Sequence, residues 1–323
     1  MTTFGLQLPN FSFPGPFGGP DAEPVPTEGM FEHVAGLAGV AEDVGFESVW
    51  VMDHFWQLPP LGGPDQPILE GYTLLGALAA RTQRVKLGTL VTGVTYRNPA
   101  LLAKMVTTLD VISGGRAILG IGAAWYEEEH AALGFEFPPV SERMHRLEQA
   151  VQICRAMFTE DAPSFNGMHY RIDGAKNVPR PIQQGGPPIL VGGSGEKRTL
   201  RIVARYADMC NIHGSAATIK RRLDILRAHC DEVGRDYSEI TTTRRGSLIV
   251  TESEEEADGL AKMLRDAAGP EFDEQFTVGT EEQVLEQVGM LVDAGLDSLI
   301  FDMAYAPPET VRRIGTALVA NFG

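Results

Sequence analysis

The chain has 323 residues, a length that fits either two domains of average size or one large α/β barrel. Its 43 acidic residues outnumber its 27 basic ones, and the formal net charge of −16 disfavours contact with nucleic acid or anionic lipid. Hydrophobic residues make up 43% of the chain, enough for a large core, which excludes an intrinsically disordered protein. We therefore expect a folded protein that acts on small molecules.

The three cysteines, Cys154, Cys210 and Cys230, are an odd number without C-x-x-C spacing, and no zinc-ligand pattern surrounds them. They predict reduced, buried thiols in a cytoplasmic protein, with no metal site. The first residues lack a basic segment, and no apolar run approaches the roughly 18–20 residues of a membrane span. We expect neither a leader peptide nor a membrane helix.

Strand-like and helical patterns alternate along the whole chain, which is typical of a parallel sheet. The eight candidate strands are Thr3–Leu8, Ser48–Asp53, Val85–Gly93, Arg116–Gly122, Pro188–Gly193, Asp208–His213, Ile240–Val250 and Leu296–Met303. No G-x-G-x-x-G follows the first strand, so a doubly wound dinucleotide-binding sheet is disfavoured. The sequence predicts a single (β/α)₈ TIM barrel over residues 1–323.

Four connections are too long for simple turns and are predicted as insertions: about 9–26, 54–69, 123–140 and 160–187. The first three follow a strand, so they belong to the C-terminal rim, where barrel active sites lie. The fourth precedes the fifth strand and contains a small β-excursion at 168–172. Without these insertions the chain has the size of one barrel of roughly 250 residues.

Asp53 and His54 follow the second strand, at the catalytic rim. A carboxylate beside a histidine there can supply acid–base chemistry near neutral pH. An equally plain interpretation is that Asp53 caps a neighbouring helix and His54 is a half-buried loop residue.

A glycine-rich loop follows the fifth strand at Gly192, Gly193 and Ser194 and leads into a helix. Glycine-rich turns and helix N-termini bind phosphate, and the next rim loop, with His213 and Ser215, would form a second wall. The alternative is an ordinary βα turn at a crowded barrel end.

Small residues also end the third and fourth strands, at 88–93 and 120–124. They leave room for a flat, wide ligand across the barrel mouth, although close packing inside the barrel explains them equally well. Trp56 and Trp125 follow in rim loops, where each is either a platform for a ring or a packing residue.

Seven segments in one order over nearly the whole chain resemble the luciferase-like monooxygenase superfamily, and within it the deazaflavin-dependent oxidoreductases. They are Phe4–Pro9, Ala41–His54, Leu87–Thr92, Tyr96–Lys104, Ile112–Ala123, Pro188–Gly195 and Asp293–Asp302. The resemblance implies a barrel that holds coenzyme F420, a deazaflavin, or alternatively FMN, and it suggests a homodimer.

The resemblance also assigns roles to individual residues. His54 would lie beside the ring, either as the proton donor or as a residue that shapes the hydride-transfer site, with Asp53 orienting it. The bond Thr89–Leu90 would be the family's non-prolyl cis peptide under the ring. The remaining cofactor-binding positions would be Gly122, Trp125, Gly192, Gly193, Ser194, His213 and Ser215.

Two positions depart from the glucose-6-phosphate dehydrogenase branch. Trp125 stands where that branch has a carboxylate, and Leu58 stands where it has a tryptophan. We therefore expect hydride transfer between F420 and a small, rather apolar organic substrate. The alternatives are an FMN-dependent monooxygenase that uses O₂ and, from another class, a phosphate-binding lyase or isomerase or a non-catalytic cofactor carrier.

Overall fold

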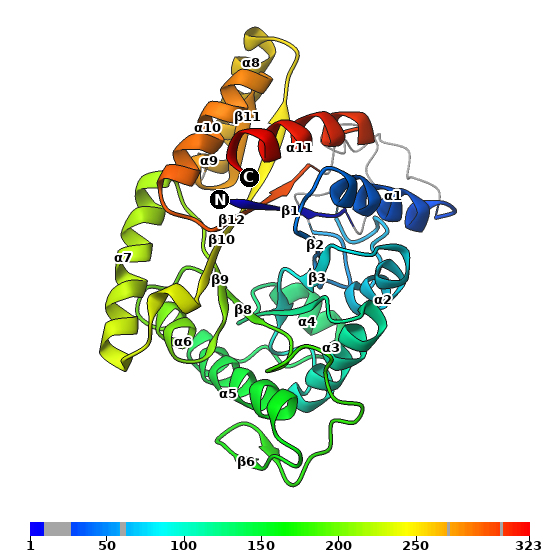
Figure 1. Cartoon of the computed structure of the whole chain (residues 1–323), viewed down its shortest axis with the longest axis vertical. Coiled ribbons are helices and arrows are strands. Elements are labelled where there is room, and N and C mark those ends of the chain that lie inside the picture. Colours follow the sequence, from blue (N-terminus) through cyan, green and yellow to red (C-terminus); the bar gives the residue numbers. More distant parts are fainter. Residues whose placement is uncertain (10–26, 59–62, 270–271, 304–305) are drawn as a thin grey trace.

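The computed structural model describes residues 1–9, 27–58, 63–269, 272–303 and 306–323. Eight parallel strands close into a barrel in which each strand pairs with the next and the last with the first (Figure 1). In spatial order they are β1 (Thr3–Gln7), β2 (Ser48–Val51), β3 (Lys86–Thr89), β5 (Ala117–Gly122), β8 (Ile189–Gly192), β9 (Met209–Asn211), β10 (Thr241–Val250) and β12 (Ser298–Asp302). The predicted (β/α)₈ barrel is confirmed.

Helices surround the barrel and cover the outer faces of its strands (Figure 1). They are α1 (Met30–Asp43), α2 (Gly71–Arg81), α3 (Pro99–Ser113), α4 (Glu127–Leu133), α5 (Val140–Thr159), α6 (Thr199–Tyr206), α7 (Ala216–Val233), α8 (Glu254–Ala268), α9 (Phe272–Gln275), α10 (Glu281–Asp293) and α11 (Pro308–Phe322), with a 3₁₀ turn at Tyr237–Glu239. Local sequence explains several helix starts. Asn98 caps α3 just before Pro99, and Thr280 and Gln283 form a capping box on α10.

The barrel interior is a small apolar cluster of four buried residues from four strands, Trp50, Ile118, Leu190 and Ile300. Leu90, Val91 and Met209 pack against it. These side chains fill the barrel, so ligands have access only at its ends.

The structure describes four further short strands beside the eight of the barrel. The third predicted strand divides into β3 and β4 (Thr92–Gly93), because the chain bulges inward at Leu90 and Val91. β11 (Phe276–Gly279) pairs with the second half of β10 and was overlooked because it is a four-residue run between two helices. A hairpin of β6 (Phe165–Asn166) and β7 (Arg171–Ile172) lies in the predicted insertion 160–187.

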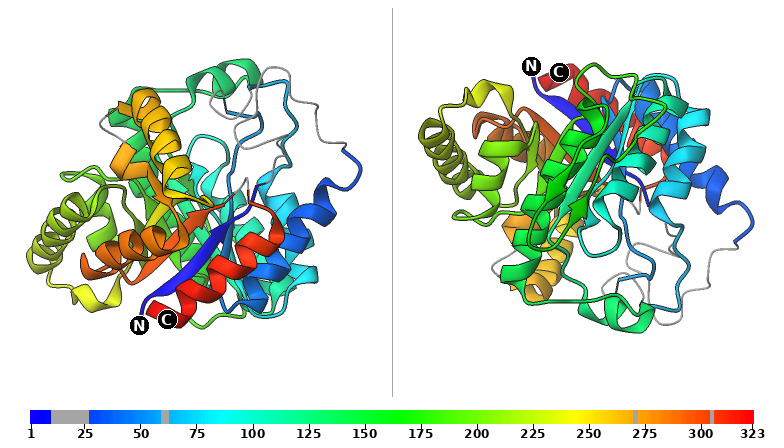
Figure 2. Two further views of the ribbon diagram at one scale, coloured as in Figure 1. Left: turned by 90° about the horizontal axis from the view of Figure 1, so that it is seen from above. Right: turned by 90° about the horizontal axis from the view of Figure 1, so that it is seen from below.

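The carboxyl ends of the barrel strands point to one rim, and α4 and α8 lie toward that same end (Figure 2). The predicted insertion 123–140 contributes α4. The insertion 9–26 lies almost wholly outside the described residues, and part of 54–69 does as well. The single-domain boundaries and the homodimer stay predictions.

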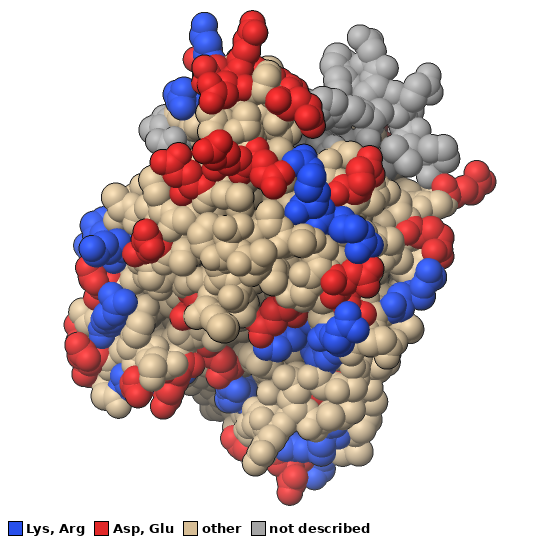
Figure 3. All heavy atoms as spheres, turned by 45° about the horizontal axis from the view of Figure 1, so that its top comes forward, with Lys and Arg blue, Asp and Glu red and all other residues tan. Residues whose placement is uncertain are grey.

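The surface carries the acidic excess. In the face shown in Figure 3, acidic side chains gather over α8, whose first turn holds Glu254, Glu255 and Glu256. Among the described helices, none combines the length and apolarity that a bilayer crossing requires. All three cysteines are free and buried, as predicted.

Candidate active site

His54 lies just beyond β2 at the carboxyl rim of the barrel, with only 8% of its surface exposed. Its Nδ1 lies 3.1 Å from Oε2 of Glu129, a fully buried residue of α4. No residue in the described part of the chain hydrogen-bonds to its Nε2. One ring nitrogen is thus held by the protein, and the other remains available to a ligand.

Glu129 accepts several hydrogen bonds at once. Its Oε1 accepts the backbone N–H groups of Phe55 (2.6 Å) and Trp56 (2.9 Å), and its Oε2 accepts the hydroxyl of Tyr96. Burial alone would raise the pKa of Glu129, but hydrogen bonds from His54 and Tyr96 hold it below its ordinary value. An ionised Glu129 can only accept, so Nδ1 of His54 carries a proton and Nε2 is the nitrogen that gains or loses one.

Tyr96 is itself fixed from the other side. Its ring stacks on His130, with centroids 4.6 Å apart. His130 Nδ1 donates to the carbonyl of Tyr126 at 2.6 Å, so its Nε2 accepts from the Thr95 hydroxyl, also at 2.6 Å. Burial lowers the pKa of His130, which keeps it neutral. The support beneath the His54–Glu129 pair is therefore a rigid, fully bonded layer.

Asp53 does not orient His54, contrary to the expectation. Its carboxylate forms a bidentate ion pair with Arg97, at 2.6 and 3.0 Å, and Arg97 also contacts Glu70 at 2.7 Å. Asp53 and His54 are adjacent in the chain beyond the end of β2, yet their side chains contact different partners. Burial raises the pKa of Asp53, and the charge of Arg97 opposes that rise. Asp53 fastens the chain after β2 to the start of α3.

The inward bulge between β3 and β4 follows β3, the strand that pairs with β2 next to His54. Thr89 is fully buried, and its Oγ1 contacts the Gly120 carbonyl at 2.9 Å and Thr92 at 2.9 Å. Its hydroxyl is thus used inside the protein. The non-prolyl cis bond is Leu90–Val91, one bond later than the predicted Thr89–Leu90.

Val91 occupies the space that the small residues leave. A Cβ on Gly122 would lie 2.8 Å from Val91 Cγ2, and a Cβ on Gly192 would lie 2.9 Å from its Cγ1. The glycines that end β5 and β8 therefore make room for the bulge itself, which for Gly122 is the packing alternative; cofactor binding by Gly122 and Gly192 stays a prediction. The ligand surface on this side is the apolar bulge of Leu90 and Val91.

The two rim loops predicted to bind phosphate do lie together. Ser194 Oγ accepts the backbone N–H of His213 at 2.8 Å, and Gly193 N–H donates to the Asn211 carbonyl at 3.0 Å. Gly193 has φ of +120°, a conformation that favours glycine. Ser215 caps α7 by accepting from Thr218 N–H, so its hydroxyl oxygen already has an internal role.

Three arginines give this side of the mouth a positive potential. Although His213 is exposed, partial desolvation of its ring and the charges of Arg245, Arg244 and Arg222 lower its pKa to about 4. Arg244 is fully buried and bonds to the carbonyls of Gly214 and Glu274, at 3.0 Å each. A chain of net charge −16 thus keeps a local site suited to an anionic group.

Trp125 is 60% exposed and lies edge-on to His54, with ring centroids 5.6 Å apart. It also stacks on Tyr126 at 5.1 Å. An exposed aromatic ring beside the free nitrogen of His54 is placed to contact a bound ligand.

Sequence reasoning missed Glu129, Tyr96 and Arg97 as members of the site. Glu129 is the third of three consecutive glutamates, and its neighbours Glu127 and Glu128 are exposed. Only the orientation of α4 distinguishes it from them. Arg97 and Tyr96 belong to a recognised segment, but nothing in their spacing pairs them with the residues after β2.

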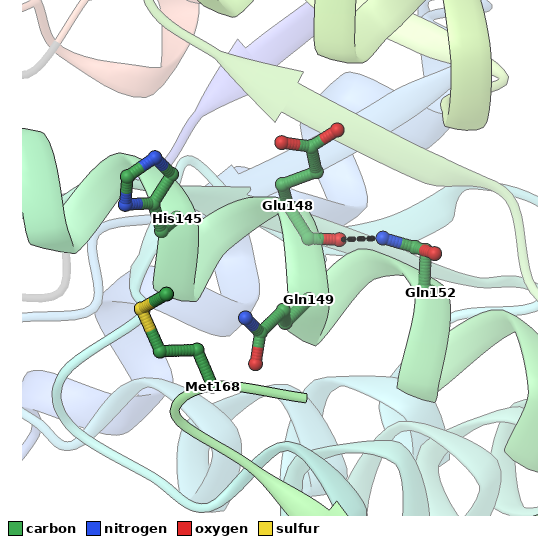
Figure 4. Close-up of a pocket in the computed structure, with 5 residues that line it drawn as sticks. All are labelled: His145, Glu148, Gln149, Gln152 and Met168. Atoms are coloured by element: carbon green, nitrogen blue, oxygen red, sulfur yellow. Dashed lines mark hydrogen bonds between the residues drawn. The ribbon is translucent and has the colours of Figure 1, made fainter. Parts of the chain in front are cut away.

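A hollow of about 250 Å³ lies elsewhere, on the outward face of α5 (Figure 4). It is lined by His145, Glu148, Gln149, Gln152 and Met168. Gln149 Oε1 accepts the backbone N–H of His169 at 3.1 Å, so this hollow marks where the β6–β7 hairpin is fastened to α5. Among the described residues, no cluster of His, Cys, Asp and Glu could hold a metal ion.

The sequence model of the luciferase-like monooxygenase family matches residues 11–275. The chain belongs to this family. The resemblance to this family is thus confirmed, together with the barrel fold that it implied.

Two curated relatives carry a more specific name. The F420-dependent glucose-6-phosphate dehydrogenase of Amycolatopsis mediterranei is 38% identical over 168 residues, which cover 52% of this chain and 47% of that protein. The enzyme of the same name from Nakamurella multipartita is 35% identical over 213 residues, covering 65% and 61%. The chain thus spans about half to three fifths of the length of these relatives.

The fold is shared more widely. A solved F420-dependent secondary alcohol dehydrogenase, in complex with an F420–acetone adduct, superposes with a TM-score of 0.81, covering 99% of this chain and 98% of that one. The two sequences are 19% identical, so this likeness concerns the fold.

Proposed function

We propose that this luciferase-like protein is an F420-dependent oxidoreductase that transfers a hydride between the deazaflavin and a small organic substrate. The observation that carries the proposal is the buried Glu129–His54 pair at the barrel mouth, in which His54 Nε2 has no hydrogen-bond partner among the residues that the structure describes. The names of the two curated relatives support F420 as the cofactor.

The residues present suit such a cofactor. The apolar bulge of Leu90 and Val91 offers a flat surface for a ring, and Trp125 adds an exposed aromatic face. Gly193 and Ser194 precede α6, whose N-terminus has no side-chain cap, and would bind the phosphate of the cofactor. The cofactor would supply the hydride chemistry at its C5.

His54 would transfer the proton that accompanies the hydride. When a carbonyl is reduced, the hydride adds to the carbonyl carbon and Nε2 donates a proton to the oxygen. In the opposite direction Nε2 removes the hydroxyl proton as the hydride leaves the carbon. Glu129 would keep Nδ1 protonated and the ring correctly oriented, and so stabilise the charged imidazolium.

The substrate is proposed to have a mainly apolar body. The mouth combines the Leu90–Val91 bulge with the rings of Trp125 and Tyr126. Trp125 and Leu58 stand where the sugar-phosphate enzymes have other residues, which supports a substrate other than glucose 6-phosphate.

The experiment is anaerobic incubation of purified protein and oxidised F420 with secondary alcohols, 2-hydroxy acids and glucose 6-phosphate, followed by the visible absorbance of the cofactor. At least one donor is expected to bleach F420, and His54→Ala should slow the bleaching about 10²–10⁴-fold while F420 affinity stays near that of the parent protein. Equal rates in the variant and the parent would contradict the role of His54.

A further inference from the structure

A second polar group lies at the mouth, on three neighbouring strands. Ile300 belongs to the barrel interior, so Asp302, two residues later on β12, points to the same side. Gly5 faces Ser48 and Ile300, which puts Gln7 of β1 on the interior face too. On β10, Thr243 contacts the inward Asn211, so Arg245 and Ser247 also point inward.

Arg245 is held in place from two sides. Its Nε donates to Gln7 Oε1 at 2.7 Å, and its Nη2 donates to Asp302 Oδ2 at 2.5 Å. Ser247 Oγ lies 3.2 Å from the same carboxylate oxygen. Nη1 donates no hydrogen bond to any residue that the structure describes, and 28% of the Arg245 side chain is exposed. The guanidinium of Arg245 is thus held in place, and its Nη1 can donate a hydrogen bond to a ligand in the mouth.

The local charge balance is positive. Asp302 neutralises Arg245, but the adjacent Arg244 has carbonyl partners and no carboxylate partner among the described residues. Arg222 bonds to the His213 carbonyl and lies 3.9 Å from Glu196, which is shared with Arg221. The low pKa of His213 agrees with this excess of positive charge. The electrostatic potential there therefore favours the binding of an anionic group over that of a neutral group.

The arrangement around the rim relates Arg245 to His54. His54 follows β2, Gln7 ends β1, Asp302 ends β12 and Arg245 lies on β10, so these polar groups occupy four consecutive strands. The apolar bulge follows β3. A molecule bound in the mouth would therefore meet His54 and Arg245 on one half of the rim. It would meet the apolar bulge of Leu90 and Val91 on the other half.

We propose that Arg245 binds a carboxylate of the substrate, which makes the substrate an organic acid with an apolar body. This inference rests on the proposed function, because it concerns the same mouth. Gln7 and Asp302 are positioning residues: they hold the guanidinium so that Nη1 faces the ligand. Arginine suits this role because its planar fork matches the geometry of a carboxylate.

The test is a calorimetric titration of the protein, with and without F420, using benzoate and its neutral isostere benzamide as probes. Benzoate is expected to bind about tenfold or more tightly than benzamide. Arg245→Met should abolish that preference, whereas Arg312→Met, at an exposed arginine paired with Asp43, should preserve it.

A second variant, Asp302→Asn, distinguishes the loss of a specific carboxylate contact from general damage to the fold. It removes the competing negative charge while Gln7 still holds Arg245, so benzoate affinity should rise, a gain that a damaged protein would not show. Equal binding of the two probes by the parent protein, or an unchanged benzoate preference in Arg245→Met, would overturn the inference. Failure of the protein to bind F420, with the benzoate preference intact, would instead contradict the proposed function alone.

Discussion

The carboxylate of Glu129 lies 3.1 Å from Nδ1 of His54, although 75 positions separate the two residues in the chain. This contact joins α4 to the end of β2 and fixes which nitrogen of His54 faces the barrel mouth. The first prediction concerns it directly.

Glu129→Gln should slow turnover with F420 about 10–100-fold, because an amide no longer stabilises a charged His54 ring. F420 affinity should change little, whereas the pH dependence of turnover should change. Glu128→Gln removes an exposed neighbour in the same helix and is the matched control. Identical pH profiles for the parent and Glu129→Gln would show that Glu129 has no part in orienting His54.

The Asp53–Arg97 pair should contribute to stability rather than to proton transfer. Arg97→Met leaves a buried carboxylate without its partner and should lower the free energy of unfolding by about 3–5 kcal/mol. Arg81→Met breaks an exposed pair with Glu32 and should lower the free energy of unfolding far less, because solvent screens that pair. Urea denaturation of both variants measures the difference, and equal midpoints would refute the structural role given to Arg97.

The contact between Gly192 and Val91 predicts a compensating pair of substitutions. Gly192→Ala places a methyl group against Val91 and should destabilise the protein by about 1–3 kcal/mol. In a protein that already carries Val91→Ala, Gly192→Ala should lower the free energy of unfolding by a clearly smaller amount. Gly76→Ala, in α2 with open space around it, should be neutral or stabilise by up to about 1 kcal/mol. Strictly additive effects of the first two substitutions would show that the two side chains do not compete for space.

His213 should stay neutral well below its usual range, with a pKa of about 4 in place of 6.5. Between these values the unfolded chain binds the extra proton and the folded chain does not. The contribution of His213 to the free energy of unfolding therefore falls as the pH is lowered from about 6.5 to 4. An NMR titration of the histidine ring protons measures the midpoint, and Arg245→Met should raise it. A midpoint near 6.5 in the parent protein would mean that the arginines do not act on this ring.

The barrel and part of the site were predictable from the sequence. The alternation of strands and helices predicts eight βα units, and the position of His54 after the second strand places it at the rim. The pairing of His54 with Glu129 was not predictable, because three adjacent glutamates look alike until α4 is placed. The role of Gly122 stayed open for a similar reason: a small residue at a strand end leaves space for a ligand or for a neighbouring side chain, and only the structure shows Val91 in that space.

The central claim is that the mouth binds a deazaflavin for hydride transfer, and side-by-side equilibrium titrations with F420 and FMN test it most directly, each followed by exposure of the reduced, bound cofactor to air. The account predicts saturable F420 binding, affinity for FMN about tenfold or more weaker, and reduced F420 that persists in air. Tight FMN binding with rapid oxygen-dependent reoxidation, and no binding of F420, would contradict it and indicate a monooxygenase.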